Sequence, residues 1–191
     1  MKIQESFFVF RGLGQSIKIN ARQAIEKGLL QTEAETLDAS TIAGLPAINV
    51  QGKILSQMPP QALAAVIAGA AFDPQLHEGY SYTQELSGQV KSWCVIDGQL
   101  VSERGEAVPL PGFIVDPLVL IFNLTNLVNR PELWVLAGSK LYVASVAGAG
   151  ENQVVLSVHN RKISIQVDSQ GLVLAKLRIL PLLEFALQRL P

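Results

Sequence analysis

The side chains best suited to acid-base, nucleophilic or metal chemistry are few and widely separated in this sequence. His77 lies in a polar segment with Asp73 and Glu78, a group that could in principle bind a metal, but adjacent residues such as His77 and Glu78 face different ways. The second histidine, His159, lies in a segment typical of a hairpin turn. We therefore predict that both histidines face solvent, and we identify no metal site, no cofactor and no catalytic residue.

Two further motifs could carry chemistry, and both favour a structural interpretation. Cys94 is the only cysteine, which excludes an intrachain disulfide, and its apolar, strand-like neighbours predict a buried side chain rather than a reactive thiolate. The segment Gly12-Leu13-Gly14 lies between a predicted strand and a predicted helix, as phosphate-binding loops do. A dinucleotide fingerprint would require a small residue where Ile17 stands, so we predict a simple turn.

The composition excludes several classes of partner. Hydrophobic residues make up 49% of the chain and charged residues only 16%, against roughly 25% in an average globular protein. The formal net charge is -1 and the basic residues are scattered, which predicts no nucleic-acid partner. Prolines and polar residues interrupt the charge-poor stretches 54–72 and 107–129, so we expect no transmembrane segment. The N-terminal residues lack the apolar region of a secretory signal, which predicts a soluble, cytoplasmic protein.

The sequence predicts a single domain, residues 1–191, whose first part, residues 1–72, is rich in helices. Residues 3–11 are aromatic and β-branched, as in a strand, whereas apolar residues recur at helical spacing from Ser16 to Leu30. Alternation over residues 47–55 predicts a second strand, and Pro59 and Pro60 open a predicted helix that ends at Phe72. Residues 73–87 are polar and are predicted to form a loop or linker.

Residues 88–191 have the pattern of a β-meander with one internal and one C-terminal helix. Asp97-Gly98 suits a two-residue hairpin turn, and Asp116-Pro117 suits the start of a helix that extends to about Val128. Short gaps separate strands predicted at residues 133–146, 153–158, 162–167 and 172–180. We therefore predict an α+β fold, with a mostly antiparallel sheet or open β-barrel in the C-terminal half and three or four packed helices.

An apolar surplus is concentrated in two predicted helices. The C-terminal one, residues 182–190, has only a narrow polar stripe, and the first turn after Pro117 is similarly apolar. These side chains could be internal core, could line a cavity for an apolar ligand, or could form an interface with another subunit. The candidate interface residues are Leu182, Leu183, Phe185, Leu187, Leu190, Leu118, Ile121 and Phe122.

These features favour a non-enzymatic interaction or assembly protein, self-associating as a homo-oligomer or binding a protein partner through its apolar helices. The alternative is a binding module for an apolar small molecule or lipid. An enzyme is a third possibility, and it would require two acidic residues, for example from among Asp73, Glu78 and Asp116, to converge in a cleft.

Overall fold

The strands of this protein are connected mainly by tight turns, as seen in a computed structural model that describes residues 3–12, 15–41, 51–180 and 183–191. Three of these turns are residue pairs in which both φ angles are positive, as a type I′ hairpin turn requires. They are Lys27-Gly28 (52° and 81°), Ser87-Gly88 (51° and 79°) and the predicted Asp97-Gly98 (50° and 71°). Local turn chemistry thus produces successive antiparallel hairpins.

Fifteen strands of the described residues form one sheet, in the order β8-β7-β6-β5-β4-β3-β2-β1-β15-β14-β13-β12-β11-β10-β9. The first group consists of β1 (Gln4–Gly12), β2 (Gln15–Glu26), β3 (Leu29–Thr41), β4 (Gly52–Met58), β5 (Ser81–Leu86), β6 (Gln89–Ile96), β7 (Gln99–Ser102) and β8 (Ala107–Pro109). The second consists of β9 (Ile114–Val115), β10 (Leu133–Ala137), β11 (Lys140–Gly150), β12 (Gln153–Val158), β13 (Arg161–Asp168), β14 (Gly171–Leu180) and β15 (Leu183–Arg189). Antiparallel pairing of β1 with β15 joins the two groups.

The fold is therefore mostly β, and the prediction of an α+β fold with three or four helices is wrong. Most of the described residues lie in strands, and only a small share lie in helices. The described residues contain two α-helices, α1 (Pro60–Ala68) and α2 (Pro117–Asn123), and one short 3-10 helix, η1 (Pro74–His77). The sheet also extends through both halves of the chain instead of the C-terminal half alone.

Two predicted helices are strands. Residues 16–30 form β2 and its turn into β3, and residues 183–189 form β15 in the middle of the sheet. In both segments the apolar residues fit two periods. Ile17 and Ala21 are four residues apart, as on one face of a helix, yet with Ile19 between them they also alternate. Leu183, Phe185 and Leu187 follow the same pattern. Pairing with neighbouring strands decides between the periods. The predicted loop at residues 73–87 likewise contains η1 and β5.

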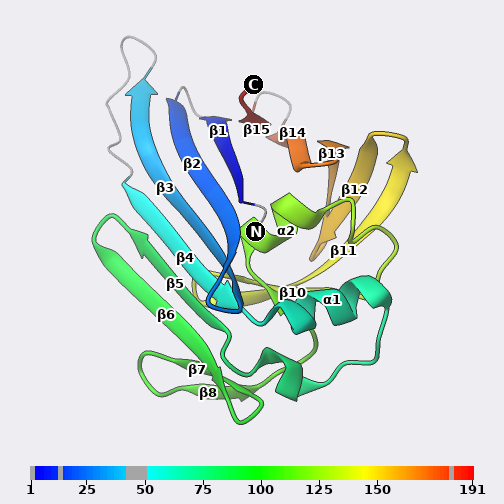
Figure 1. Ribbon diagram of the computed structural model, residues 1–191. Helices are drawn as coiled ribbons and strands as arrows, with labels where there is room; N and C mark the ends of the chain where they lie inside the picture. The colour runs from blue at the N-terminus through cyan, green and yellow to red at the C-terminus, as the bar shows by residue number, and fades with distance from the viewer. Residues whose placement is uncertain (1–2, 13–14, 42–50, 181–182) are drawn as a thin grey trace.

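Helix α2 is covered by both halves of the curved sheet. Figure 1 shows it between the arm that contains β2 and β3 and the arm that contains β11 to β13, and it contacts β2, β3, β10 and β14. Its residues Leu118 and Phe122 are buried, and the Phe122 ring packs edge-on against Phe8 of β1 with 6.3 Å between ring centroids. The helix also supplies the crossover between β9 and β10, which is the one parallel pair among the described strands.

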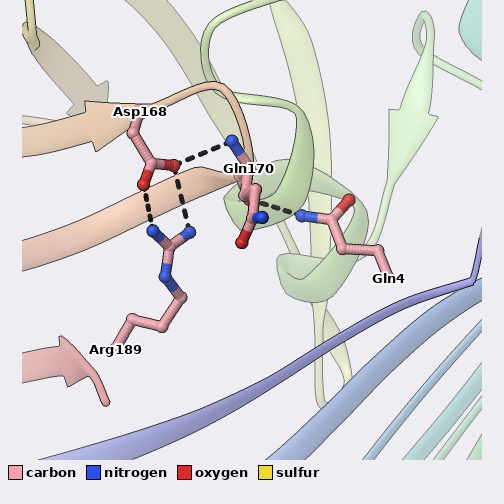
Figure 2. A network of polar contacts seen from close by, with 4 residues as sticks. All are labelled: Gln4, Asp168, Gln170 and Arg189. Atoms are coloured by element: carbon pink, nitrogen blue, oxygen red, sulfur yellow. Dashed lines mark hydrogen bonds and ion pairs between the residues drawn. The ribbon is translucent and has the colours of Figure 1, made fainter. Parts of the chain in front are cut away.

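Polar contacts hold the junction of β1, β14 and β15 in register. Figure 2 shows the guanidinium of Arg189 on β15 facing both carboxylate oxygens of Asp168, at the turn between β13 and β14. The backbone N–H of Gln170 donates to Asp168 at 2.7 Å, and the side chain of Gln4 on β1 donates to the Gln170 carbonyl. The hydrogen bond from Arg189 holds the pKa of Asp168 below its usual range.

The open side of the curved sheet is bridged by the turn between β10 and β11. The Trp93 indole N–H on β6 donates to the Gly138 carbonyl at 3.1 Å, and the Gly138 N–H donates to the Tyr82 hydroxyl at 3.4 Å. Trp93 and Tyr82 are cross-strand partners on β6 and β5. The two arms of the sheet therefore meet at this turn and enclose α2.

Candidate ligand-binding site

A cavity of about 200 Å³ lies on the face of the sheet that is turned toward α2. Phe8 contacts α2, and Phe10, two residues further along β1, shares its face and lines the cavity. Strands β2 to β5 supply the other apolar lining residues, which are Ile17, Ile19, Ala34, Ile54 and Leu86. Leu86 is 46% exposed, so the cavity reaches the molecular surface at this side chain.

A buried polar cluster anchors α2 to the sheet. Asp116 is the N-cap of α2, and its Oδ1 accepts hydrogen bonds from the backbone N–H groups of Leu118 and Val119 at 2.7 and 3.0 Å. Its Oδ2 accepts a hydrogen bond from the hydroxyl of Ser56 on β4. The Ser56 hydroxyl lies 2.6 Å from the hydroxyl of Thr32 on β3. Burial raises the pKa of Asp116, and these hydrogen bonds oppose the rise.

Aromatic rings enclose His77 at the end of η1. The ring lies 5.9 Å from Phe113, 6.1 Å from Phe72 and 6.5 Å from Tyr80, measured between centroids. Within the described part of the chain, neither ring nitrogen of His77 has a hydrogen-bond partner, and the Tyr80 hydroxyl also lacks one. Burial lowers the pKa of His77 to about 4, which keeps the imidazole neutral at physiological pH.

The prediction that His77 faces solvent is therefore wrong, whereas His159 is exposed in the turn between β12 and β13. Asp73 and Glu78 do not form a site with His77, because Asp73 caps η1 and Glu78 accepts from the Gly98 N–H at 2.7 Å. Across residues 3–12, 15–41, 51–180 and 183–191, no three His, Cys, Asp or Glu side chains could together hold a metal.

Cys94 is half-buried on β6, less enclosed than the sequence predicts. Of the glycine motif, residues 13 and 14 lie outside the described residues, and Gly12 ends β1 beside the Phe185 ring. A strand, β2, follows this motif instead of the predicted helix. Neither helix of the described residues is long and apolar enough to cross a membrane.

The described residues among those predicted to form an apolar interface fall into two groups, one on α2 and one at β15. On α2, Leu118 and Phe122 are buried and Ile121 is half-buried. On β15, Phe185 and Leu187 are half-buried, and the Phe185 ring stacks on Phe10 at 5.8 Å between centroids; Leu190, just after β15, is also half-buried. Leu183 is the first residue of β15, and Leu182 lies outside the described residues.

Sequence reasoning missed the residues that line the cavity, because they come from five strands. The available signal was alternation: Ile17 and Ile19 on β2 alternate with polar residues, as Ile54 does on β4. Alternation identifies the buried face of each strand but does not show where facing side chains leave a space. Ala34 is an example: it lines the cavity and is smaller than the isoleucines around it, which alternation alone does not reveal.

Comparison with known proteins shows a shared fold but no family. No family model matches the chain, and no curated protein matches it. A solved β-barrel-like protein of the domain of unknown function DUF1849 from Brucella abortus superposes with a TM-score of 0.60, over 98% of this chain and 95% of the other, at 6% identity. A DUF1089 family protein from Pseudomonas aeruginosa has 14% identity and a TM-score of 0.34, over 90% of this chain and 87% of the other. The protein therefore has the fold of a β-barrel-like protein whose own function is unknown.

Proposed function

We propose that this protein is a non-enzymatic binding module for a small apolar molecule or the hydrocarbon chain of a lipid. The observation that carries this proposal is the cavity on the inner face of the sheet, lined by aliphatic and aromatic side chains from β1 to β5. An apolar cavity with a few polar groups is the usual form of a small-molecule site. In this interpretation the apolar surplus of the sequence serves both the core and the site.

The size of the cavity limits what it can hold. At about 200 Å³ it is smaller than the roughly 300–1,000 Å³ of sites for drug-sized ligands, so it suits a short chain or one part of a larger molecule. Each buried methylene contributes about 0.8 kcal/mol, so six would contribute about 5 kcal/mol. Because association itself is costly, we expect dissociation constants from high micromolar to millimolar for a simple octyl chain.

A cavity-filling substitution tests this proposal. Ala34 is 5% exposed and lines the cavity, so Ala34→Leu should occupy much of the space while the protein still folds. We expect binding of pentaethylene glycol monooctyl ether, measured by isothermal titration calorimetry, to weaken at least about tenfold, the loss of two to three methylene contacts. Ala147→Leu is the matched control, because Ala147 is exposed on β11, and it should bind as the unmodified protein does.

Two results would contradict the proposal: no binding of the ether by the unmodified protein, or equal binding by a folded Ala34→Leu variant. Circular dichroism and thermal unfolding of both variants establish that they are folded. Native mass spectrometry of the gently purified protein gives an independent test, because a bound natural lipid would appear as a fixed increase in mass.

Self-association is a second proposed role, favoured by large hydrophobic side chains that remain exposed on the described surface. Val90, Ile96 and Val108 are 55%, 51% and 41% exposed, and all belong to β6 or β8 near one edge of the sheet. Light scattering at micromolar concentrations tests this role directly. A monomer at all concentrations would exclude it and leave the ligand-binding proposal unaffected.

A further inference from the structure

The inner face of β1 to β5, which holds the cavity, carries no charged side chain in its described part. Side chains alternate between the two faces of a strand, and Phe8 and Phe10 on β1 mark the inner face. The pairing registers carry this alternation across the sheet to β5, where Tyr82, Gln84 and Leu86 belong to the same face. Every described residue that the registers assign to this face in β1 to β5 is uncharged.

The charged residues of β3, β4 and β5 near the cavity belong to the outer face. Glu35, Lys53 and Glu85 are register partners, each next in sequence to a residue of the inner face. On the outer face the Lys53 ammonium pairs with Glu33 at 2.8 Å. The sheet therefore separates these charges from a molecule bound in the cavity.

Lys91 on β6 is the first charged side chain that the inner face carries beside the cavity. It lies directly opposite Gln84 in the register of β5 and β6, and Gln84 lines the cavity. The Lys91 ammonium donates to the hydroxyl of Ser139, in the turn between β10 and β11, at 3.4 Å. Gln84 reaches the same turn, because its Oε1 lies 3.5 Å from the position of a Cβ atom at Gly138. The ammonium and the cavity therefore adjoin on one face of the sheet.

Lys91 also lines a polar hollow of about 610 Å³. A second register pair crosses the boundary between the two spaces, because Leu86 of the cavity lies opposite Gln89 of the hollow. Side chains that are directly opposite on one face have Cβ atoms about 5 Å apart. An amphipathic molecule can therefore place its chain in the cavity and its polar end beside Lys91.

The hollow is lined by two cations and two carboxylates, but Lys91 is the only one of the four that is half-buried. Glu103, Arg104 and Glu106 are exposed. Glu103 accepts a hydrogen bond from the Ser92 N–H at 2.8 Å, and this bond, more than the charges of Arg104 and Lys91, holds the pKa of Glu103 below its usual range. Solvent and salt screen exposed charges more than half-buried ones, so Lys91 dominates the potential beside the cavity.

We infer that the site selects amphipathic molecules with an anionic end, such as the carboxylate of a fatty acid, which the Lys91 ammonium binds while the hydrocarbon chain enters the cavity. This inference rests on the proposed function. The Ser139 hydroxyl is a second donor for the anion. A neutral end lacks the attraction to the ammonium, and a cationic end is repelled by it.

Three probes with an eight-carbon chain test the inference at neutral pH: octanoate, its neutral analogue octanamide, and octylammonium, each below its critical micelle concentration. In calorimetric titrations at low salt we expect octanoate to bind at least about threefold more tightly than octanamide, and octylammonium to bind most weakly. The preference should shrink in about 0.5 M NaCl. If the octyl ether binds but octanoate binds no more tightly than octanamide, the inference is wrong and the proposed function stands. Failure of the ether and all three probes would overturn the proposed function itself.

Substitutions at Lys91 identify the cause of the preference. Lys91→Gln should bring octanoate to within about twofold of octanamide, whereas Lys91→Arg, which keeps the charge, should retain the preference. Lys162→Gln is the matched control, because Lys162 is exposed on β13 and lines neither the cavity nor the hollow. A folded Lys91→Gln variant with the original preference, or an equal loss in the control, would contradict the role of Lys91.

Discussion

Asp116 shows how one buried side chain can connect a helix to a sheet. It caps α2 through two backbone N–H groups and reaches β4 through Ser56. A buried carboxylate is costly unless its charge is compensated by hydrogen bonds, and burial here shifts the pKa of Asp116 upward, toward the neutral acid. Because the folded protein binds this proton more tightly than the unfolded chain does, the proton stabilises the fold most below the ordinary pKa near 3.8. This stabilisation is lost as the pH rises through the folded-state pKa of Asp116.

Two substitutions at Asp116 should have very different costs. Asparagine can cap α2 with its Oδ1 and donate its amide to Ser56, so we expect Asp116→Asn to lower the free energy of unfolding by less than about 1 kcal/mol. Alanine leaves the N–H groups of Leu118 and Val119 and the Ser56 hydroxyl unpaired, so Asp116→Ala should cost about 3–5 kcal/mol. Urea unfolding of the two variants measures the difference, and equal costs would show that the capping network does not stabilise the fold.

His77 should make the protein sensitive to acid. The pKa of His77 is about 4 in the folded protein and 6.5 when solvated, so the unfolded chain binds a proton over a range in which the folded one does not. The neutral imidazole of His77 contributes its full share of the free energy of unfolding above about pH 6.5. This share, about 3 kcal/mol in total, is lost as the pH falls toward 4.

Substitution with a ring that does not titrate isolates this contribution. We expect His77→Phe, which retains an aromatic ring beside Phe72, Phe113 and Tyr80, to lose less stability between pH 6.5 and 4.5 than the unmodified protein does. Thermal unfolding across this pH range provides the measurement. Because other acidic groups titrate alike in both proteins, an identical pH dependence would assign the acid sensitivity to those groups.

At the scale of elements, β14 begins in close contact with α2. Gly171 has a φ of 99°, and a Cβ atom there would lie 2.9 Å from the Phe122 Cα and 3.0 Å from its carbonyl carbon. Gly105 also has a positive φ, 77°, but no atom lies within 4 Å of its Cβ position. Replacing Gly105 by a residue with a side chain therefore costs only the strain of the backbone conformation, whereas replacing Gly171 adds a steric clash with α2.

We expect Gly105→Ala to lower the free energy of unfolding by about 1 kcal/mol, the cost of a left-handed backbone for a residue with a side chain. Gly171→Ala should cost at least about 2 kcal/mol more, because the backbone of α2 must also move. Denaturant unfolding of the two variants gives the comparison, and equal costs would mean that α2 yields at Phe122 without strain.

The elements that the sequence predicts correctly are those decided by local chemistry. Asp97-Gly98 forms the predicted hairpin turn, and Asp116 caps the predicted helix, although that helix ends at Asn123 instead of near Val128. Residues 183–189 were predicted incorrectly because a partner is remote: β15 pairs with β1 across almost the whole chain. Residues 16–30 pair with the adjacent strands β1 and β3, and the prediction there is wrong because their apolar residues fit both a helical and an alternating period. The cavity is harder still to predict, since it depends on the sizes of side chains from five strands.

At the scale of the whole molecule, the cavity exists because one sheet curves around α2. Contacts from Trp93 and Tyr82 to the turn at Gly138 hold one arm of the sheet near the other. The cavity lies beside the middle of β3, the start of β4 and the end of β5, on the face of the sheet that it shares with Phe8, whose ring contacts α2. The curved sheet therefore accounts for both the enclosed helix and the proposed site, because its inner face is larger than α2 alone can cover.

The pairing of β1 with β15 has a consequence for synthesis of the protein. Phe8 pairs with Arg189, so the inner edge of β1 has no partner until nearly the whole chain has left the ribosome. At translation rates of 5–20 residues per second, that wait is on the order of 10–40 s. During this interval β1 to β8 present an open strand edge that carries Phe8 and Phe10. An unpaired strand edge can add a strand from another chain, so we expect the nascent chain to be most prone to aggregation during this interval.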